Sequence, residues 1–432
     1  MKNLEELSLK IADEFKSRGI VKAQHCLSSK ETLEFTLELG EFKLLRTLFD
    51  NGLSVTVYDG ARKGVAAGND LSWDGINSVI DSAVSSARAS DEDPAYDFAP
   101  DQGEHIYNDG APDVDKDKFF ERISEFSKTL SEEYPQLRVS EFIAKHQSFH
   151  IIQRNTNGSH FDKTSGYYEI VAQYCATGED ITTNIDYVAL ATVDLDTPFI
   201  DQSTIRKELD DSVLQLKRVE IPGKFTGSVI LKPDCMQSFL GSIIGNYASS
   251  NSVLEGTSQW LDKVGEKVAD ERLTVTFDPE ASCMISPTHI TGDDFVAEKY
   301  SLIEKGVFNG HMLNLYAANK SGRPLIKNDG NNTIILPGSK SLDDIIRETK
   351  QGLIVKSFAG GQPGSNGEFS GIVKNSLYVE NGEIKGAVTE TMINGNLGGM
   401  LNNIRDISSE VVYDGFSAVP YIAFENIVVS TK

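Results

Sequence analysis

Cysteine is scarce in this chain of 432 residues. The four cysteines, Cys26, Cys175, Cys235 and Cys283, stand far apart in the sequence. This spacing excludes both a CxxC metal clip and a disulfide framework. A reducing compartment suits such a chain, and we expect a cytoplasmic protein. Because Cys235 and Cys283 have no neighbouring histidine, we interpret them as buried, inert thiols.

Long apolar runs are missing as well. No window approaches eighteen consecutive apolar residues, which excludes a membrane-spanning helix. The first residues place Leu4, Leu7, Ile11 and Phe15 at helical spacing, with charged residues between them. This pattern predicts an amphipathic helix rather than a signal peptide, so we expect neither export nor a membrane partner.

Basic residues are in deficit. The chain has 41 Lys and Arg against 64 Asp and Glu, which gives a formal net charge of −23. Such a chain repels phosphates, so we exclude a non-specific duplex binder and expect no nucleic-acid partner. With 39% hydrophobic and 24% charged residues the composition is that of a globular protein. The length predicts two or three domains, each able to bury a core.

The patterning of the first half predicts a mixed helix and antiparallel-sheet domain, and therefore the α+β fold class. Strict alternation over Leu33–Leu39 and Leu53–Val57 predicts two strands. Ser72 is placed to cap the helix that follows it. The other predicted elements are helices over Phe119–Leu130 and Ile205–Leu216, strands at 137–153 and 167–176 around an Asn157-Gly158 turn, and a loop-rich connection at 89–117.

Ile221-Pro222-Gly223 marks the domain boundary that we predict, with domains at 1–220 and 221–432. Beyond it, short apolar runs are separated by turns rich in Gly and Asn. This arrangement predicts a β-rich C-terminal domain with few helices. The expected strands lie at 228–231, 273–277, 333–336, 353–355, 376–379 and 427–430.

The common catalytic motifs are absent: there is no GxSxG, no GxxxxGK[ST] and no GxGxxG after a strand. His146 and His150 have a spacing that binds zinc on a helix, but they lie among strand-like segments. On a strand the same spacing separates the rings by about 13 Å. We therefore favour an ordinary histidine pair and keep a metal site there as the less favoured alternative. The acidic pairs Asp293-Asp294 and Asp343-Asp344 are interpreted as solvated surface rather than a glycosidase dyad.

Two glycine clusters, Phe358–Gly364 and Asn394–Met400, each allow two interpretations. Their backbone N–H groups could bind an anion or a carboxylate. A tight turn at a strand end, or a turn from a strand into a helix, explains the same residues. For the first cluster we favour the turn, and for the second the two interpretations stay equal.

Two segments of the second half carry a specific pattern: Asn375–Ile384 (NSLYVENGEI) and Met392–Ile404 (MINGNLGGMLNNI). They resemble the TldD/PmbA (TldE) family of microbial metalloproteases, which also has the older label "modulator of DNA gyrase". The resemblance covers most of the chain and is looser in the N-terminal half. Further landmarks in the same order are Gly256-Thr257-Ser258, Val264-Gly265-Glu266, Phe308–Met312 and Phe358–Gln362.

In the metal-bearing TldD branch of this family, a helix carries HExxxH. Its histidines bind the metal, its Glu polarises a water, and a Cys near the C-terminus completes the site. Here those slots hold Gly241 and Asn246 for the histidines and Ser242 for the Glu, and no cysteine follows Cys283. The chain therefore resembles the metal-free PmbA/TldE branch, and we expect no catalytic residue, metal or cofactor in it. The segment itself predicts an amphipathic helix capped by Asp234.

The resemblance implies a subunit of a cytoplasmic metalloprotease whose TldD-like partner supplies zinc or a similar divalent metal. An unfolded, extended peptide would pair with strand edges, which we place near 358–362 and 389–396. Whether the chain also forms a homodimer when alone stays open. The residues that we expect to contact the peptide backbone or to line the cavity are Gly360, Gly361, Gln362, Thr389, Thr391, Asn394 and Asn396.

The alternative function is a non-enzymatic, acidic regulator that binds a topoisomerase or another basic target. The net charge and the older family label support it. Binding by such a regulator would weaken steeply with salt, whereas a protease subunit would bind its partner through a buried apolar interface. A third hypothesis is a protease in its own right, with a metal held by His146 and His150.

Overall fold

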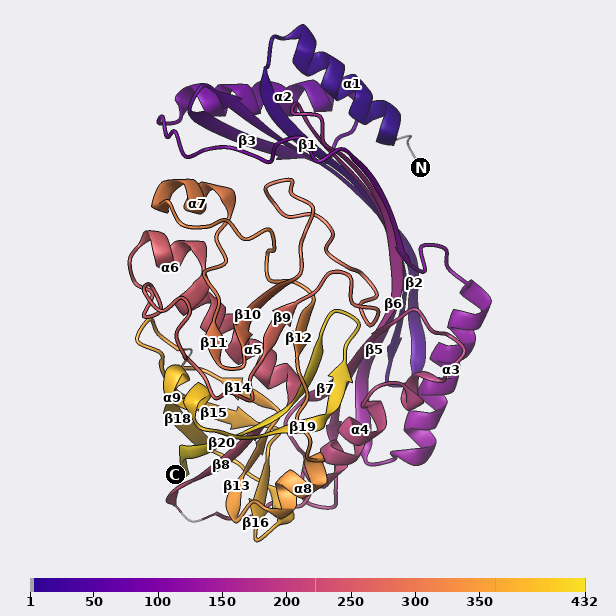
Figure 1. Cartoon of the computed structure of the whole chain (residues 1–432). Coiled ribbons are helices and arrows are strands. Elements are labelled where there is room, and N and C mark those ends of the chain that lie inside the picture. The colour runs from indigo at the N-terminus through magenta and orange to yellow at the C-terminus, as the bar shows by residue number, and fades with distance from the viewer. Residues whose placement is uncertain (1–3, 222, 362, 432) are drawn as a thin grey trace.

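The computed structural model describes residues 4–221, 223–361 and 363–431. The fold is α+β, as predicted, with one large sheet from each half of the chain. The N-terminal sheet is long and curved, and the C-terminal domain lies on its concave side (Figure 1). Among the described residues, no helix is long and apolar enough to cross a membrane.

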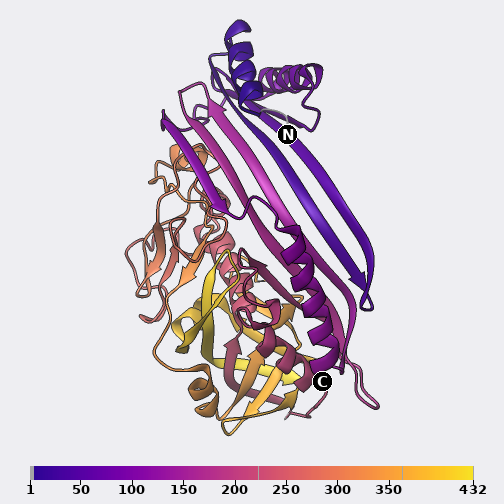
Figure 2. The ribbon, with the colours of Figure 1, turned by 90° about the vertical axis from the view of Figure 1, so that its right-hand side faces the viewer.

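The N-terminal sheet has the order β3-β2-β1-β5-β6-β4, and β7 also pairs with β6. Its neighbours are antiparallel except β4, which runs parallel to β6. Figure 2 shows the long strands side by side. The strands are β1 (Lys22–Glu38), β2 (Glu41–Asp59), β3 (Arg62–Gly68), β4 (Glu104–Gly110), β5 (Leu137–Asn155), β6 (His160–Ala176) and β7 (Asp186–Thr192).

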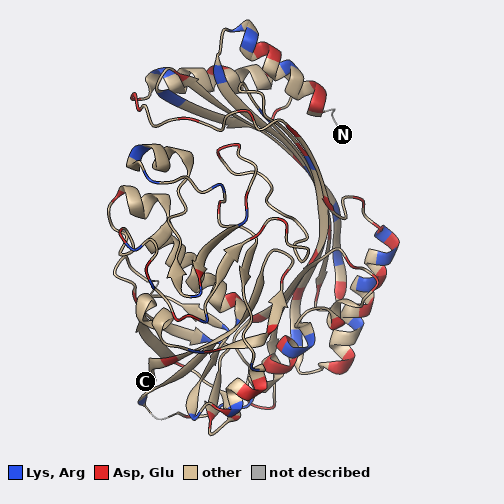
Figure 3. Ribbon diagram, viewed as in Figure 1, with Lys and Arg blue, Asp and Glu red and all other residues tan. Residues whose placement is uncertain are grey.

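Two helix pairs cover the two ends of this sheet. The helices α1 (Leu4–Ser17) and α2 (Trp73–Ala89) share one core cluster with the first strands. The helices α3 (Lys116–Glu133) and α4 (Ile205–Leu214) share another with β5, β6 and β7. Figure 3 shows charged residues of both signs along α1 and α3, which is the pattern of solvated helix surfaces.

The C-terminal sheet has the main order β11-β10-β9-β12-β20-β8-β13-β16-β17, and β20 also pairs with β18 and β19. A branch continues from β18 to β15 and β14. The strands are β8 (Lys224–Leu231), β9 (Val275–Phe277), β10 (Tyr300–Glu304), β11 (Val307–Phe308), β12 (Thr333–Ile335), β13 (Gln351–Val355), β14 (Ser357–Ala359), β15 (Glu368–Lys374), β16 (Leu377–Glu380), β17 (Glu383–Ala387), β18 (Thr391–Asn396), β19 (Ile404–Tyr413) and β20 (Ala418–Thr431).

The helices of this domain are short, as expected for a β-rich domain. The longest of them in the described residues, α5 (Pro233–Ile243), continues into a π-helical turn at Ile244–Ala248. The others are α6 (Ser250–Leu254), α7 (Leu315–Ser321), α8 (Leu342–Arg347) and α9 (Leu397–Asn402).

Most of the predicted elements are confirmed, including every strand expected in the second half. The hydroxyl of Ser72 accepts from the N–H of Gly75 and caps α2 as predicted. The loop-rich connection at 89–117 is wrong in part, because it contains β4. The cap assigned to Asp234 is also wrong: Lys232 is the N-cap residue of α5 and Pro233 opens the helix, a position that suits proline.

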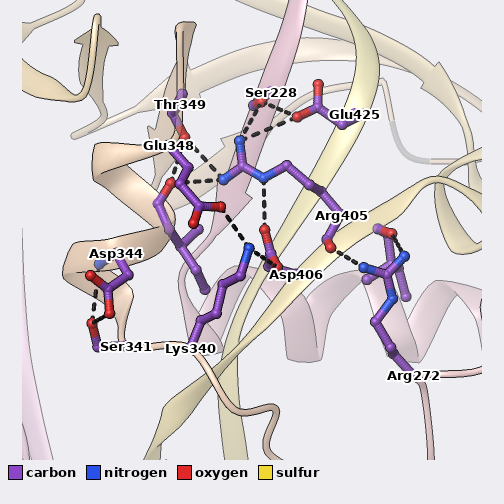
Figure 4. A network of polar contacts seen from close by, with 12 residues as sticks. Ser228, Arg272, Lys340, Ser341, Asp344, Glu348, Thr349, Arg405, Asp406 and Glu425 are labelled. Atoms are coloured by element: carbon purple, nitrogen blue, oxygen red, sulfur yellow. Dashed lines mark hydrogen bonds and ion pairs between the residues drawn. The ribbon is translucent and has the colours of Figure 1, made fainter.

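Arg405 joins four parts of the C-terminal domain (Figure 4). Its guanidinium donates to the carbonyl of Ile345 at 2.8 Å, to Thr349 at 3.0 Å and to Ser228 at 3.0 Å. A further donor contacts Glu425 at 3.2 Å, and the Nε forms an ion pair with Asp406 at 3.0 Å. Because every donor of this half-buried side chain is used, we assign Arg405 a structural role.

Candidate functional site

The slots that the family resemblance assigns to a metal lie on α5 and the π-helical turn. Gly241 is exposed, and a Cβ added to it would meet no atom within 4 Å. The hydroxyl of Ser242 donates to the carbonyl of Ser238 at 3.2 Å, and the amide of Asn246 donates to the carbonyl of Pro363 at 3.1 Å. These three residues do not fit a divalent metal. Glycine has no side-chain ligand, and the hydroxyl and the amide both donate to backbone carbonyls.

The histidine pair lies on β5, where the strand prediction placed it. His146 bonds through Nε2 to the carbonyl of Ala111 at 2.8 Å, and His150 bonds to Asp162 at 2.9 Å. The two rings therefore serve different partners. Across the described parts of the chain, no group of three or more His, Cys, Asp or Glu residues is placed to hold a metal ion.

The inward side of α5 belongs to the core. Cys235 is buried there, and desolvation raises the pKa of its thiol to about 12. The predicted burial of Cys235 is confirmed, and a raised pKa disfavours the reactive thiolate at neutral pH. Cys283 is only half-buried, although burial raises its pKa as well.

An open strand surface, which we call the β15–β18 face, lies on the side of these strands that points away from α5, because Phe369 on their other side packs against Phe239 of α5. It consists of Glu368, Ser370, Ile372 and Lys374 on β15 with Met392, Asn394 and Asn396 on β18. Cross-strand pairing sets Glu368 opposite Asn396, Ser370 opposite Asn394 and Ile372 opposite Met392. The hydroxyl of Ser370 bonds to the side chain of Asn394. The amide of Asn396 donates to the carbonyl of Asn366 at 2.9 Å, which fixes the loop between β14 and β15.

Three of the predicted residues share one open cavity of about 500 Å³ on this face. Gly361, Asn394 and Asn396 line it together with Glu368 and Ser370. Thr389 lines a neighbouring cavity of about 440 Å³ with Lys374 and Met392. Thr391 is fully buried, and its hydroxyl donates to the carbonyl of Thr389 at 2.9 Å.

Glycines allow the loop after β14 to approach β15. Gly361 has φ +54°, and a Cβ added to it would lie 1.6 Å from the carbonyl oxygen of Ser370. Gly360 has φ +76°, but a Cβ there would meet open space. Gln362, also predicted to contact the peptide, lies outside the described residues. The backbone at Gly361 therefore requires glycine for two reasons and that at Gly360 for one.

The strands β14 and β18 differ in the edges that they offer. β14 pairs with β15 on one flank, and no second partner is found within the described residues. β18 is paired on both flanks, with β15 and with β20. The strand edge expected near 389–396 is therefore wrong over Met392–Asn394, because these residues have strand partners on both flanks.

A third cavity, of about 360 Å³, lies where the two domains meet. Lys232 and Lys356 line it and are both buried. They contact Glu208 of α4, at 3.0 and 3.1 Å, and Lys356 also contacts Asp186 at 2.7 Å. Burial disfavours the charged form of both lysines, but the neighbouring carboxylates outweigh it and raise their pKa.

These lysines were not predicted, although the sequence contains a signal for them. Each lysine directly follows a predicted buried run, at 228–231 and at 353–355. Those runs form the parallel neighbours β8 and β13, with Leu231 paired to Val355. Parallel strands end at the same edge of a sheet, so the two lysines are brought together.

Two sequence profiles match this chain over 26–87 and 223–431. They are described as PmbA/TldA metallopeptidase domain 1 and PmbA/TldA metallopeptidase C-terminal domain. The chain belongs to the PmbA/TldD family. Metalloprotease PmbA of Escherichia coli O157:H7 is 25% identical to it over 413 residues, which are 90% of this chain and 88% of that protein.

Solved structures show the same PmbA/TldD fold. TldE from Thermococcus kodakarensis superposes with a TM-score of 0.84 at 19% identity, over 98% of this chain and all of that one. A Bacteroides thetaiotaomicron protein with the provisional label of a DNA gyrase modulator reaches 0.86 at 21% identity, over the full length of both chains. The fold of the whole chain is therefore that of the family.

Proposed function

We propose that this chain is the metal-free subunit of a cytoplasmic, two-subunit metalloprotease that degrades or trims unfolded peptides. A TldD-like partner supplies zinc or a similar divalent metal together with the Glu base. One observation carries the proposal: in a member of a metallopeptidase family, the metal slots hold Gly241, Ser242 and Asn246, none of which suits the metal.

In this proposal the chain forms part of the substrate-binding surface and supplies no catalytic group. We assign one wall of the substrate cavity to the β15–β18 face. The loop before β15, which Asn246 contacts at Pro363 and Asn396 contacts at Asn366, connects this face to the π-helical turn. An extended peptide adds to the free flank of β14, where main-chain hydrogen bonds bind it with little sequence preference. Asn394 and Asn396 lie on β18, across β15 from that flank, so in this proposal they line the open cavity and do not contact the added strand.

The decisive experiment measures metal content and peptidase activity of the purified chain, alone and after mixing with a TldD-like partner. An unfolded polypeptide serves as substrate. We expect a metal-free, inactive chain that confers or raises activity only in the mixture. Stoichiometric metal and activity in the chain alone would overturn the proposal and return attention to His146 and His150.

The acidic regulator is the second candidate, and the net charge of −23 and the label of the Bacteroides relative favour it. The two candidate functions predict different effects of ionic strength on binding affinity. A regulator held to a basic target by charge loses affinity steeply between low and high ionic strength. A subunit joined through a buried apolar interface keeps most of its affinity. Titrations of the partner chain at both ionic strengths distinguish them.

A further inference from the structure

The outer flank of β2 is free over Leu44–Gly52. On the inner side β1 pairs with β2 along its whole length, whereas β3 covers the outer side only from Leu53 to Asp59. At the other end the register with β1 shifts, and Lys43 is left as an extra residue. In the part of the chain that the structure describes, no strand pairs with the outer flank of Leu44–Gly52. Figure 2 shows this indigo hairpin at the margin of the sheet.

Large apolar side chains are exposed on both faces of this free segment. Leu45 and Phe49 are 62% and 67% exposed, and Leu45 lies opposite Phe35, on the face that α3 covers further inward. Leu44 and Leu48 are 40% and 38% exposed and point to the other face. A helix laid on the sheet would cover one face and leave the edge unpaired. A strand from another chain covers both faces and satisfies the backbone.

The charges of the segment identify that strand. Arg46 and Asp50 are its charged residues, and they stand symmetrically about Leu48. When the segment is laid antiparallel against itself with Leu48 opposite Leu48, each Arg46 faces Asp50 of the other copy. In a two-fold arrangement opposed residues share a face, and Arg46, Leu48 and Asp50 do so because they alternate along the strand.

The same register suits the remaining residues. It sets Leu44 opposite Gly52, so pairing extends from the bulge at Lys43 to the start of β3 and uses the whole free flank. Phe49 and Leu45 of the two copies become diagonal neighbours, within reach of an aromatic ring. Arg46 already contacts Glu34 of β1 at 2.8 Å, whereas Asp50 has no ion pair among the described residues.

We propose that two copies of this chain pair through Leu44–Gly52 of β2, antiparallel, about a two-fold axis at Leu48. The pairing joins the two N-terminal sheets into one continuous sheet. The inference does not depend on the proposed function, because it uses no residue of α5 or of the β15–β18 face.

The test is a charge swap across the axis, read by sedimentation equilibrium of the full chain from about 1 to 100 µM. R46D sets acidic residues against acidic residues in the self-pair, and D50R sets basic against basic. We expect each variant alone to raise the dimer dissociation constant about tenfold or more. An equimolar mixture of the two variants restores every opposite-charge pair, and we expect it to dimerise as the unchanged chain does.

Two further variants distinguish a change at the interface from a general effect of an added charge on folding. L48K places like charges on the axis and should give a monomer, while V65K alters an even more exposed apolar residue on β3 and should leave the dimer intact. Circular dichroism and thermal melting establish that each variant is folded. A chain that stays monomeric over the whole range overturns the proposal. So does a dimer that V65K dissociates and L48K does not, or a mixture of R46D and D50R that fails to associate.

Discussion

Lys232 and Glu208 face each other across the junction of the two domains, with the lysine Nζ 3.0 Å from each carboxylate oxygen. Asp211 lies 2.7 Å from the same Nζ, and Lys356 lies 3.1 Å from Glu208. Burial favours the protonated form of Glu208, but Lys232 and Lys356 outweigh it and lower the pKa of that carboxyl. Glu208 is therefore the shared counter-charge of two buried cations.

Replacement of Glu208 by Gln is expected to destabilise the chain at neutral pH. The variant leaves two buried lysines with less compensating charge, which costs about 3 kcal/mol of the free energy of unfolding. Denaturant unfolding of both proteins measures the difference. The control is Glu133→Gln, which breaks an exposed pair with Arg206 and should change stability by less than about 1 kcal/mol. Equal effects of the two variants would contradict the buried role of Glu208.

The cost of Glu208→Gln should depend on pH in a definite direction. A carboxyl whose pKa is lowered on folding stabilises the fold above its ordinary value of 4.5, and that contribution is lost as the pH falls through the folded pKa. The raised pKa values of the lysines add stability below 10.5 that is lost as the pH rises through their folded values. Stability measured across pH should show a constant difference between about pH 6 and pH 9 that shrinks at lower pH. A constant difference down to pH 2 would exclude the charge as its cause.

Gly361→Ala and Gly360→Ala should differ although the two glycines are adjacent. Both lie at positive φ, which costs an alanine about 1–2 kcal/mol. Only at Gly361 does the added Cβ also collide with a backbone oxygen, that of Ser370, so β14 must separate from β15. We expect Gly361→Ala to abolish the activity of the two-subunit mixture and Gly360→Ala to retain most of it. Partner metal content should be unchanged in both, and retained activity in Gly361→Ala would contradict the role given to β14.

Tyr247→Phe should be neutral or stabilising by about 1 kcal/mol. The ring of Tyr247 is buried in the π-helical turn, and its hydroxyl has no hydrogen-bond partner among the residues that the structure describes. Tyr174→Phe is the matched control, because the equally buried hydroxyl of Tyr174 bonds to Ser212 at 3.0 Å. That variant should lose about 1 kcal/mol or more. Thermal melting compares the two, and a large loss in Tyr247→Phe would indicate a bound partner for its hydroxyl.

The sequence predicted those elements whose pattern is local. The helix after Ser72 and the alternating strand at Leu33–Leu39 need only their own residues to be recognised, because one face of each is buried. The segment Glu104–Gly110 has no such signal: its residues are exposed or half-buried, and it is a strand only because it pairs in parallel with His160–Gly166. Pairing between segments distant in the chain leaves no period in the sequence.

The candidate site was predictable to a similar extent. The resemblance located Gly361, Asn394 and Asn396, which the structure brings into one cavity. It could not show how many partners a strand has, so the edge that it predicts at β18 is wrong where β15 and β20 both pair with this strand. The side-chain pattern of a strand reports which face is buried, whereas its flanks are set by backbone pairing, which is independent of residue type.

The central place of β20 has a consequence for biosynthesis. This strand lies between β8 and β18 and also pairs with β12 and β19. Residues 418–431 therefore insert between strands that leave the ribosome before they do. Until they emerge, β8 lacks its neighbour and the buried faces of Val229 and Ile393 stay open to water. The N-terminal sheet can form during translation, whereas the C-terminal sheet can be completed only after β20 has been synthesised. Apolar strands exposed for that time favour binding of the nascent chain by chaperones.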